Sequence, residues 1–224
     1  MLAHRVFCAT SVILVSVASV QAQTLSQRSQ AGHLGVSPGE TYTYRFVDTL
    51  DVTNGAWSSD EKLAVGDAFK KWQEADSKSG LNTTFAAWTG GPSAQIILRK
   101  RLLPALDGAS VPAKTLASTG EDGTVTGGTV DFNTDTTIIS NKNGFLKAAL
   151  HEIGHLHGLG HPKAKGSHWL SVMNDFGELP GGKLYQKRDD YTRNIPDDVT
   201  KQDRESAYLF AGSRKVAPAV AFQP

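Results

Sequence analysis

Residues 151–161 read His151-Glu152-Ile153-Gly154-His155-Leu156-His157-Gly158-Leu159-Gly160-His161, and this stretch decides the fold. On an α-helix, His151 and His155 lie one turn apart on the same face, where their imidazoles can bind one ion together. Glu152 lies about 100° around the helix from His151, beside that ion rather than on it. Gly158 can adopt a left-handed conformation, so it can end the helix and let the chain return His161 as a third ligand.

Three neutral nitrogen ligands with a fourth position left open are typical of catalytic zinc, because a structural zinc site fills all four positions. Zinc held by these histidines would lower the pKa of a water towards about 7 and polarise a peptide carbonyl. Glu152 is then the candidate general base, which takes the proton of the water and delivers it to the leaving nitrogen. The alternative, a helix that is merely rich in histidine, leaves the fixed spacing unexplained.

The pattern HExxHxxGxxH followed by a methionine turn is the metzincin signature, and Met173 follows His161 by twelve residues. In metzincins this methionine forms a hydrophobic floor beneath the zinc histidines. Residues 40–212 resemble the catalytic domain of the matrixins, the matrix metalloproteinase family. The resemblance implies an α+β, zincin-like fold: a twisted, mainly parallel sheet with an antiparallel edge strand, an active-site helix and a C-terminal helix.

Local patterns predict the elements around the zinc motif. Tyr42, Tyr44 and Phe46 alternate with polar residues, which indicates a half-buried strand within residues 40–50. Ser58 and Glu61 can form a capping box at the start of a helix that ends near Gly80. Further strands are predicted at residues 84–87, 95–98 and 136–140, the active-site helix from an N-cap at Asn143, and the last helix from Pro196 to Gly212.

The first 22 residues have the pattern of a cleaved secretory signal. His4 and Arg5 precede an apolar run, and Val20-Gln21-Ala22 offers small or branched residues at the positions that a signal peptidase reads. The run is shorter than the roughly 18–20 residues that a membrane span needs, which favours a signal over an anchor. We therefore expect a secreted, extracellular protein, or a periplasmic one if the source is a Gram-negative bacterium.

We divide the chain into a signal peptide (1–22), a flexible leader (23–39), a metallopeptidase domain (40–212) and a C-terminal tail (213–224). The leader is rich in Gln, Ser and Gly and shows no periodicity. The single cysteine, Cys8, leaves with the signal, so the mature chain is expected to have no disulfide. Animal matrixins are typically kept latent by a propeptide cysteine, and the mature chain has none.

The charge balance argues against two classes of partner. The formal net charge is +1, and loss of Arg5 with the signal brings it to zero. A balanced charge gives no indication of nucleic acid or an anionic membrane surface as a partner. The expected partner is a protein or peptide substrate bound in extended form to a monomer without a membrane anchor.

Residues 104–128 contain prolines and glycines but no helical period, which predicts a long loop that is functional or stabilised by an ion. In matrixins the equivalent region carries structural calcium and zinc. Four oxygen donors in and after this stretch suit calcium, and solvated loop acids are the alternative; they are Asp122, Asp131, Asn133 and Asp135. A second zinc site is not expected, because animal matrixins commonly have histidine where this chain has Asp131.

The resemblance also places the substrate. In matrixins the loop region ends in an edge strand that pairs with the substrate, so we expect residues 126–130, with Thr129 and Val130, to bind an extended peptide. Lys147 lies one turn before His151 on the same face of the helix. In matrixins the residue at this offset lines the pocket for the side chain after the scissile bond, where a lysine would favour acidic or polar groups. A lysine that points to solvent is the alternative.

Three histidines of the mature chain lie outside the ligand set. His157 follows His155 by two residues and is expected to face away from the metal. His33 is either a cap on the zinc or a solvated side chain. His168 is a fourth ligand of a latent form, a substrate contact or a surface residue.

The predicted function is zinc-dependent endopeptidase activity, and two alternatives remain. One is a processing protease that cuts a single partner. The other is a zinc-containing binding or adhesion protein without activity, which usually has lost the glutamate or a ligand; this chain has all four residues.

Overall fold

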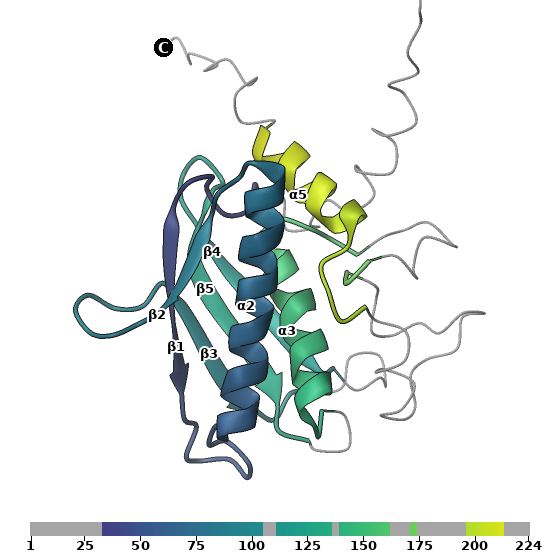
Figure 1. The fold of residues 1–224 in the computed structure, drawn as a ribbon. Coiled ribbons are helices and arrows are strands. Elements are labelled where there is room, and N and C mark those ends of the chain that lie inside the picture. The colour runs from purple at the N-terminus through teal and green to yellow at the C-terminus, as the bar shows by residue number, and fades with distance from the viewer. Residues whose placement is uncertain (1–32, 105–110, 136–138, 162–170, 174–195, 213–224) are drawn as a thin grey trace, which may run out of the picture.

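The computed structural model describes residues 33–104, 111–135, 139–161, 171–173 and 196–212. The elements, in chain order, are β1 (Thr41–Val47), α2 (Ser59–Ser79), β2 (Thr84–Ala87), β3 (Ile96–Arg101), β4 (Ala113–Thr119), β5 (Val125–Asn133), α3 (Lys142–Leu156) and α5 (Lys201–Gly212). Helices α2 and α3 lie side by side against one face of the sheet, and α5 packs against α2 (Figure 1). This arrangement agrees with the predicted α+β class.

The five strands form one mixed sheet in the order β2-β1-β3-β5-β4. Strands β2, β1, β3 and β5 run parallel to one another, and β4, which pairs with β5, runs antiparallel to them. On β3, Ile96 and Leu98 face the helices and are buried, while Ile97 and Arg99, which alternate with them, are half-buried on the other side. The sheet therefore presents an apolar face to the two helices.

Helix α2 begins and ends as its sequence predicts. The side chains and main chains of Ser58 and Glu61 form a reciprocal capping box, and Gly80 ends the helix at φ 83°. Between these caps, apolar residues at helical spacing, including Val65, Phe69 and Trp72, are fully buried. The helix thus buries one face against the sheet and α3.

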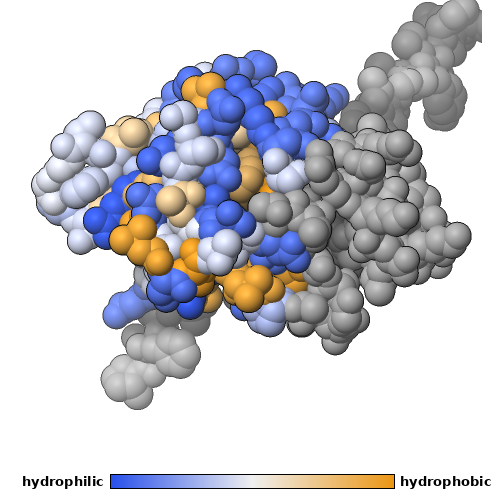
Figure 2. Space-filling model, turned by 90° about the horizontal axis from the view of Figure 1, so that it is seen from below, coloured by the Kyte–Doolittle hydropathy of each residue, from blue (hydrophilic) through white to orange (hydrophobic). Residues whose placement is uncertain are grey.

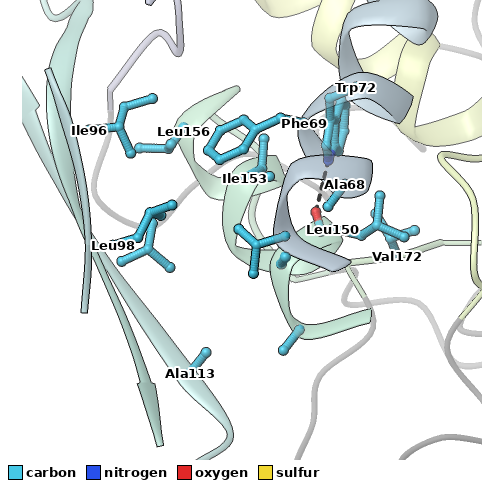
Figure 3. Packing of buried hydrophobic residues seen from close by; sticks show 14 of the residues in the cluster. Ala68, Phe69, Trp72, Ile96, Leu98, Ala113, Leu150, Ile153, Leu156 and Val172 are labelled. Carbon is cyan, nitrogen blue, oxygen red and sulfur yellow. Dashed lines mark hydrogen bonds between the residues drawn. The ribbon is translucent and has the colours of Figure 1, made fainter. Parts of the chain in front are cut away.

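Helix α3 carries the first two histidines of the zinc motif through the centre of the molecule. Its N-cap is Asn141, whose side chain accepts a hydrogen bond from Gly144, and not Asn143 as predicted. The predicted buried face is present, because Leu150 and Ile153 pack among residues of α2 and β3 (Figure 3). Trp72 Nε1 donates to the carbonyl of Leu150 at 2.9 Å, which ties α2 to α3 inside the core.

The predicted long loop at residues 104–128 contains strand β4 and the start of β5. The prediction that residues 126–130 form an edge strand is wrong, because β5 lies between β3 and β4 and pairs on both sides. Thr129 is paired with Ile97 and Leu116, and Val130 is buried in the core. The edge strand on this side of the sheet is β4, so Thr129 and Val130 have no free strand edge to offer a peptide.

The predicted leader is ordered at its C-terminal end. Leu34 donates its N–H to Gly123, Val36 forms a parallel bridge with Val125, and Val36 is buried. Gly35, at φ 80°, lies so close to the end of α3 that a Cβ there would overlap the main-chain oxygen of His157. The folded unit thus begins at residue 33 or before, and residues 23–32 lie outside the described ranges.

The last helix starts later than predicted. Helix α5 begins at Lys201, with Thr200 and Asp203 exchanging capping hydrogen bonds, whereas Pro196 and Asp197 precede it. Of the predicted strand at residues 136–140, residues 136–138 lie outside the described part of the chain, as do the predicted signal peptide and the tail.

The described surface is mixed in character. Seen from below, hydrophilic residues predominate and hydrophobic residues form small groups among them (Figure 2). Single exposed leucines such as Leu50 and Leu116 are normal for a folded protein. None of the helices in the described ranges combines the length and apolar character that a bilayer span requires.

The contact between Gly35 and the end of α3 yields a first prediction. Gly35→Ala is expected to lower the free energy of unfolding by about 3 kcal/mol, because it adds a main-chain clash to the strain of a left-handed alanine. Gly39→Ala, at φ 77° with nothing near its Cβ, is the matched control and is expected to cost about 1 kcal/mol. Urea unfolding measures both, and equal losses would show that the segment does not pack on the helix.

Candidate active site

The three histidines of the motif come together in space. Their candidate ligand atoms all lie within 4.8 Å of one another, and Nε2 of His151 is 3.0 Å from Nε2 of His161. Helix α3 positions His151 and His155, and the turn at Gly158, with φ 82°, directs the chain back so that His161 meets them. His151 is buried, His155 is half-buried and His161 is exposed, so the cluster opens to solvent on one side.

Main-chain carbonyls determine which ring nitrogen of His151 and of His155 is available to bind a metal. His151 Nδ1 lies 2.9 Å from the carbonyl of Val172, and His155 Nδ1 lies 2.8 Å from the carbonyl of Leu159. A carbonyl only accepts hydrogen bonds, so each Nδ1 carries the proton, and in the neutral ring Nε2 keeps its lone pair. Both imidazoles are therefore held in the tautomer that binds a metal through Nε2.

The donor set fits zinc. Ligands about 2.0–2.1 Å from a tetrahedral zinc lie roughly 3.3 Å from one another, close to the separation of the His151 and His161 nitrogens. The pKa of His151 is held well below its ordinary value, first by burial and then by the neighbouring His155 and His161. The ring thus stays neutral, which metal binding requires.

Glu152 follows His151 in the sequence and is buried, with 2% of its surface exposed. Burial raises the pKa of its carboxyl group to about 7, against the opposing effect of hydrogen bonds from Thr115. The Thr115 hydroxyl lies 2.7 Å from Oε2 of Glu152 and 3.0 Å from its main-chain oxygen. A carboxyl group with a pKa near 7 is suited to accept and return a proton near neutral pH.

Residues 171–173 form a buried turn beside the cluster. Asp203 of α5 holds it, accepting a hydrogen bond from the Ser171 hydroxyl at 2.6 Å and from the Val172 N–H at 3.0 Å. Burial raises the pKa of Asp203, and these donors oppose the rise. The Met173 side chain lies against Gly154 of α3, where an added Cβ would overlap its sulfur. The methionine therefore packs directly beneath the metal-binding helix.

Comparison with known proteins identifies the family of this chain. The family model described as Matrixin matches residues 38–193. The chain belongs to the matrixin family. No curated protein matches it. A solved structure described as "GM1 bound form of the ECX AB5 holotoxin" is 15% identical over 84% of this chain and 90% of that chain, with a TM-score of 0.46. That likeness is too distant to bear on function.

The oxygen donors predicted to hold calcium in this matrixin have other partners. Asp131 forms a bidentate ion pair with Arg99 of the neighbouring strand, at 2.7 and 3.0 Å. Asp122 caps the β4–β5 turn by accepting from the main chain and hydroxyl of Thr124. Asn133 donates to Val111. Among the described His, Cys, Asp and Glu residues, only the three histidines form a group of three or more candidate metal ligands. Calcium binding by Asp122, Asp131, Asn133 and Asp135 therefore stays a prediction.

Other predicted residues are placed as follows. Lys147 is buried on α3 rather than pointing to solvent; burial lowers the pKa of its ammonium group, and Asp197 opposes this effect. His157 faces Asp76 at 3.0 Å and is no part of the histidine cluster, as predicted. His33 is buried, not solvated, and burial lowers its pKa. It also lies outside the histidine cluster. His168 lies outside the described residues.

Three residues near the site of this matrixin were not singled out from the sequence: Thr115, Asp203 and Asp76. A weak signal existed for Asp203, because Thr200-Lys201-Gln202-Asp203 has the spacing of a capping box. Thr115 and Asp76 carried no signal, since their partners Glu152 and His157 lie far away in the sequence.

The raised pKa of Glu152 predicts a pH dependence of stability in the metal-free protein. Between about pH 4.5 and 7 the unfolded chain loses the proton that the folded chain retains, so the free energy of unfolding falls as the pH rises. Relative to Glu152→Gln, which cannot ionise, wild type should lose about 2–3 kcal/mol over this range. Urea unfolding of both metal-free proteins at several pH values measures the difference, and a constant difference would contradict the prediction.

The close packing of Met173 against Gly154 predicts how a larger residue at position 154 would affect stability. Gly154→Ala is expected to lower the free energy of unfolding by about 1–3 kcal/mol, because the buried Met173 and Trp72 must shift. Gly66→Ala, in α2 with only the Tyr44 hydroxyl nearby at 3.7 Å, is the control and should gain about 0.5–1 kcal/mol from helix propensity. Thermal unfolding compares them; a gain in both would show that the methionine gives way freely.

Proposed function

We propose that this matrixin is a secreted, zinc-dependent endopeptidase. The observation that supports it best is the convergence of three imidazoles, two of them held by carbonyls in the metal-binding tautomer, next to a buried glutamate. This combination of three nitrogen ligands with a base of raised pKa suits hydrolysis by an activated water.

Each residue has a distinct role in the proposed reaction. His151, His155 and His161 bind zinc, which when bound supplies an activated water and polarises the scissile carbonyl. Glu152 takes a proton on its carboxylate and gives it to the nitrogen of the departing peptide. Met173 supports the helix that carries two of the ligands.

The substrate is proposed to bind along β4 rather than β5. Strand β4 is the last strand of the sheet and leaves one edge unpaired within the described residues, so an extended peptide can add to it by main-chain hydrogen bonds. The same strand contacts Glu152 through Thr115, which brings the peptide to the base. Lys147 is retained as a candidate determinant of the pocket after the scissile bond.

Secretion rests on the sequence pattern of residues 1–22, which we propose are removed as a signal peptide. A processing protease with a single partner uses the same site and differs only in substrate range. A binding protein without activity would bind zinc through the same histidines but would not hydrolyse peptides.

The test is zinc content by mass spectrometry together with cleavage of casein and gelatin. Wild type should contain one zinc per chain and cleave, and a chelator should abolish cleavage. Glu152→Gln should keep its zinc and lose at least about 100-fold in activity, because the base is removed and the ligands are not. Glu121→Gln, an exposed glutamate in the β4–β5 turn, is the matched control and should behave as wild type.

Three other outcomes have separate meanings. Near-normal turnover by Glu152→Gln would exclude the base mechanism. Bound zinc without cleavage of any general substrate would favour the processing enzyme or the binding protein. Absence of zinc would exclude the proposed function altogether.

A further inference from the structure

Thr115 joins the edge strand to the glutamate of the zinc motif. It lies in β4, where alternate side chains point to opposite faces of the sheet. Its pairing partner on β5, Val130, is buried on the helix side, whereas the next pair, Leu116 and Thr129, lies on the other face. The Thr115 side chain is therefore directed at α3, and the exposed Leu116 at solvent.

The contact with Glu152 is a double one. The Thr115 hydroxyl is 2.7 Å from Oε2 and 3.0 Å from the main-chain oxygen of the same residue. Among the described residues, Thr115 is the side chain that donates to this carboxyl group. Glu152 has 2% of its surface exposed, so solvent offers it little alternative support. The hydroxyl is thus the side-chain donor that orients the carboxyl group, next to a hydrogen bond from the main chain of Thr115.

We propose that Thr115 is a positioning residue, whose hydroxyl fixes the Glu152 carboxyl group between α3 and the edge strand so that the base stands in register with the bound peptide. This inference rests on the proposed peptidase function. A base displaced by about 1 Å can cost on the order of 100-fold in rate, which makes a single orienting hydrogen bond consequential.

Thr115→Val tests the proposal, because valine keeps the branched shape and the strand preference of threonine and removes only the hydroxyl. In the zinc-loaded protein with a fluorogenic peptide, kcat should fall about 10- to 100-fold, with KM changed less than about twofold and zinc content unchanged. Thr115→Ser restores the hydroxyl and should return kcat to within about threefold of wild type. Thr41→Val makes the same chemical change at an exposed position of β1 and should leave kcat unchanged.

A double variant shows whether Thr115 acts through Glu152. If it does, Thr115→Val combined with Glu152→Gln should be no slower than Glu152→Gln alone, since the group to be positioned is already gone. An additional loss equal to that of the single variant overturns the proposal, as does a Thr115→Val enzyme with wild-type kcat. If Thr115→Val does not fold, Thr115→Ala replaces it with the same expectations.

The two hypotheses fail in different ways. Wild type that binds zinc and cleaves no peptide overturns the proposed function and, with it, the role of Thr115. Wild type that cleaves, loses activity in Glu152→Gln and keeps it in Thr115→Val overturns the positioning role alone.

Discussion

Hydrogen bonds from two imidazole Nδ1 atoms to main-chain carbonyls determine what the histidine cluster can bind. Because a carbonyl cannot donate, the contacts of His151 with Val172 and of His155 with Leu159 set the tautomer as well as the orientation of each ring. Rotation of either ring would break its hydrogen bond to the main chain. The ligand geometry is thus built into the main chain before any ion is bound, which reduces the ordering that metal binding requires.

The two carbonyls are in turn fixed by parts of the chain far from the motif. The Val172 carbonyl belongs to the turn that Asp203 of α5 holds by hydrogen bonds to Ser171 and Val172. The Leu159 carbonyl follows the left-handed turn at Gly158, which lies so close to Gly35 that a Cβ on Gly158 would come within 3.0 Å of the Gly35 nitrogen. Segments from both ends of the described chain therefore orient the two histidines, and the site exists only in the folded domain.

Features that depend on short sequence spacing could be predicted, and features that depend on long-range pairing could not. The capping box at Ser58, the stop at Gly80 and the meeting of the three histidines follow from spacings of a few residues. The position of the sheet edge does not. Strand β4 has few apolar residues, so its sequence resembles a loop, and only its pairing with β5 makes it the edge. The ion pair between Asp131 and Arg99 on the neighbouring strand could not be predicted either, because it too depends on strand pairing.

The contrast between His155 and His157 shows how neighbouring histidines acquire different roles. His157 has acceptor oxygens at both ring nitrogens, the carbonyl of Ile153 at 2.9 Å and the carboxylate of Asp76 at 3.0 Å. Its ring also stacks on Trp72, at 4.3 Å between centroids. With both nitrogens engaged, no lone pair remains for a metal, whereas His155 uses only Nδ1 and keeps Nε2 available. The residue type is the same, and the hydrogen-bond partners distinguish the candidate metal ligand His155 from the structural histidine His157.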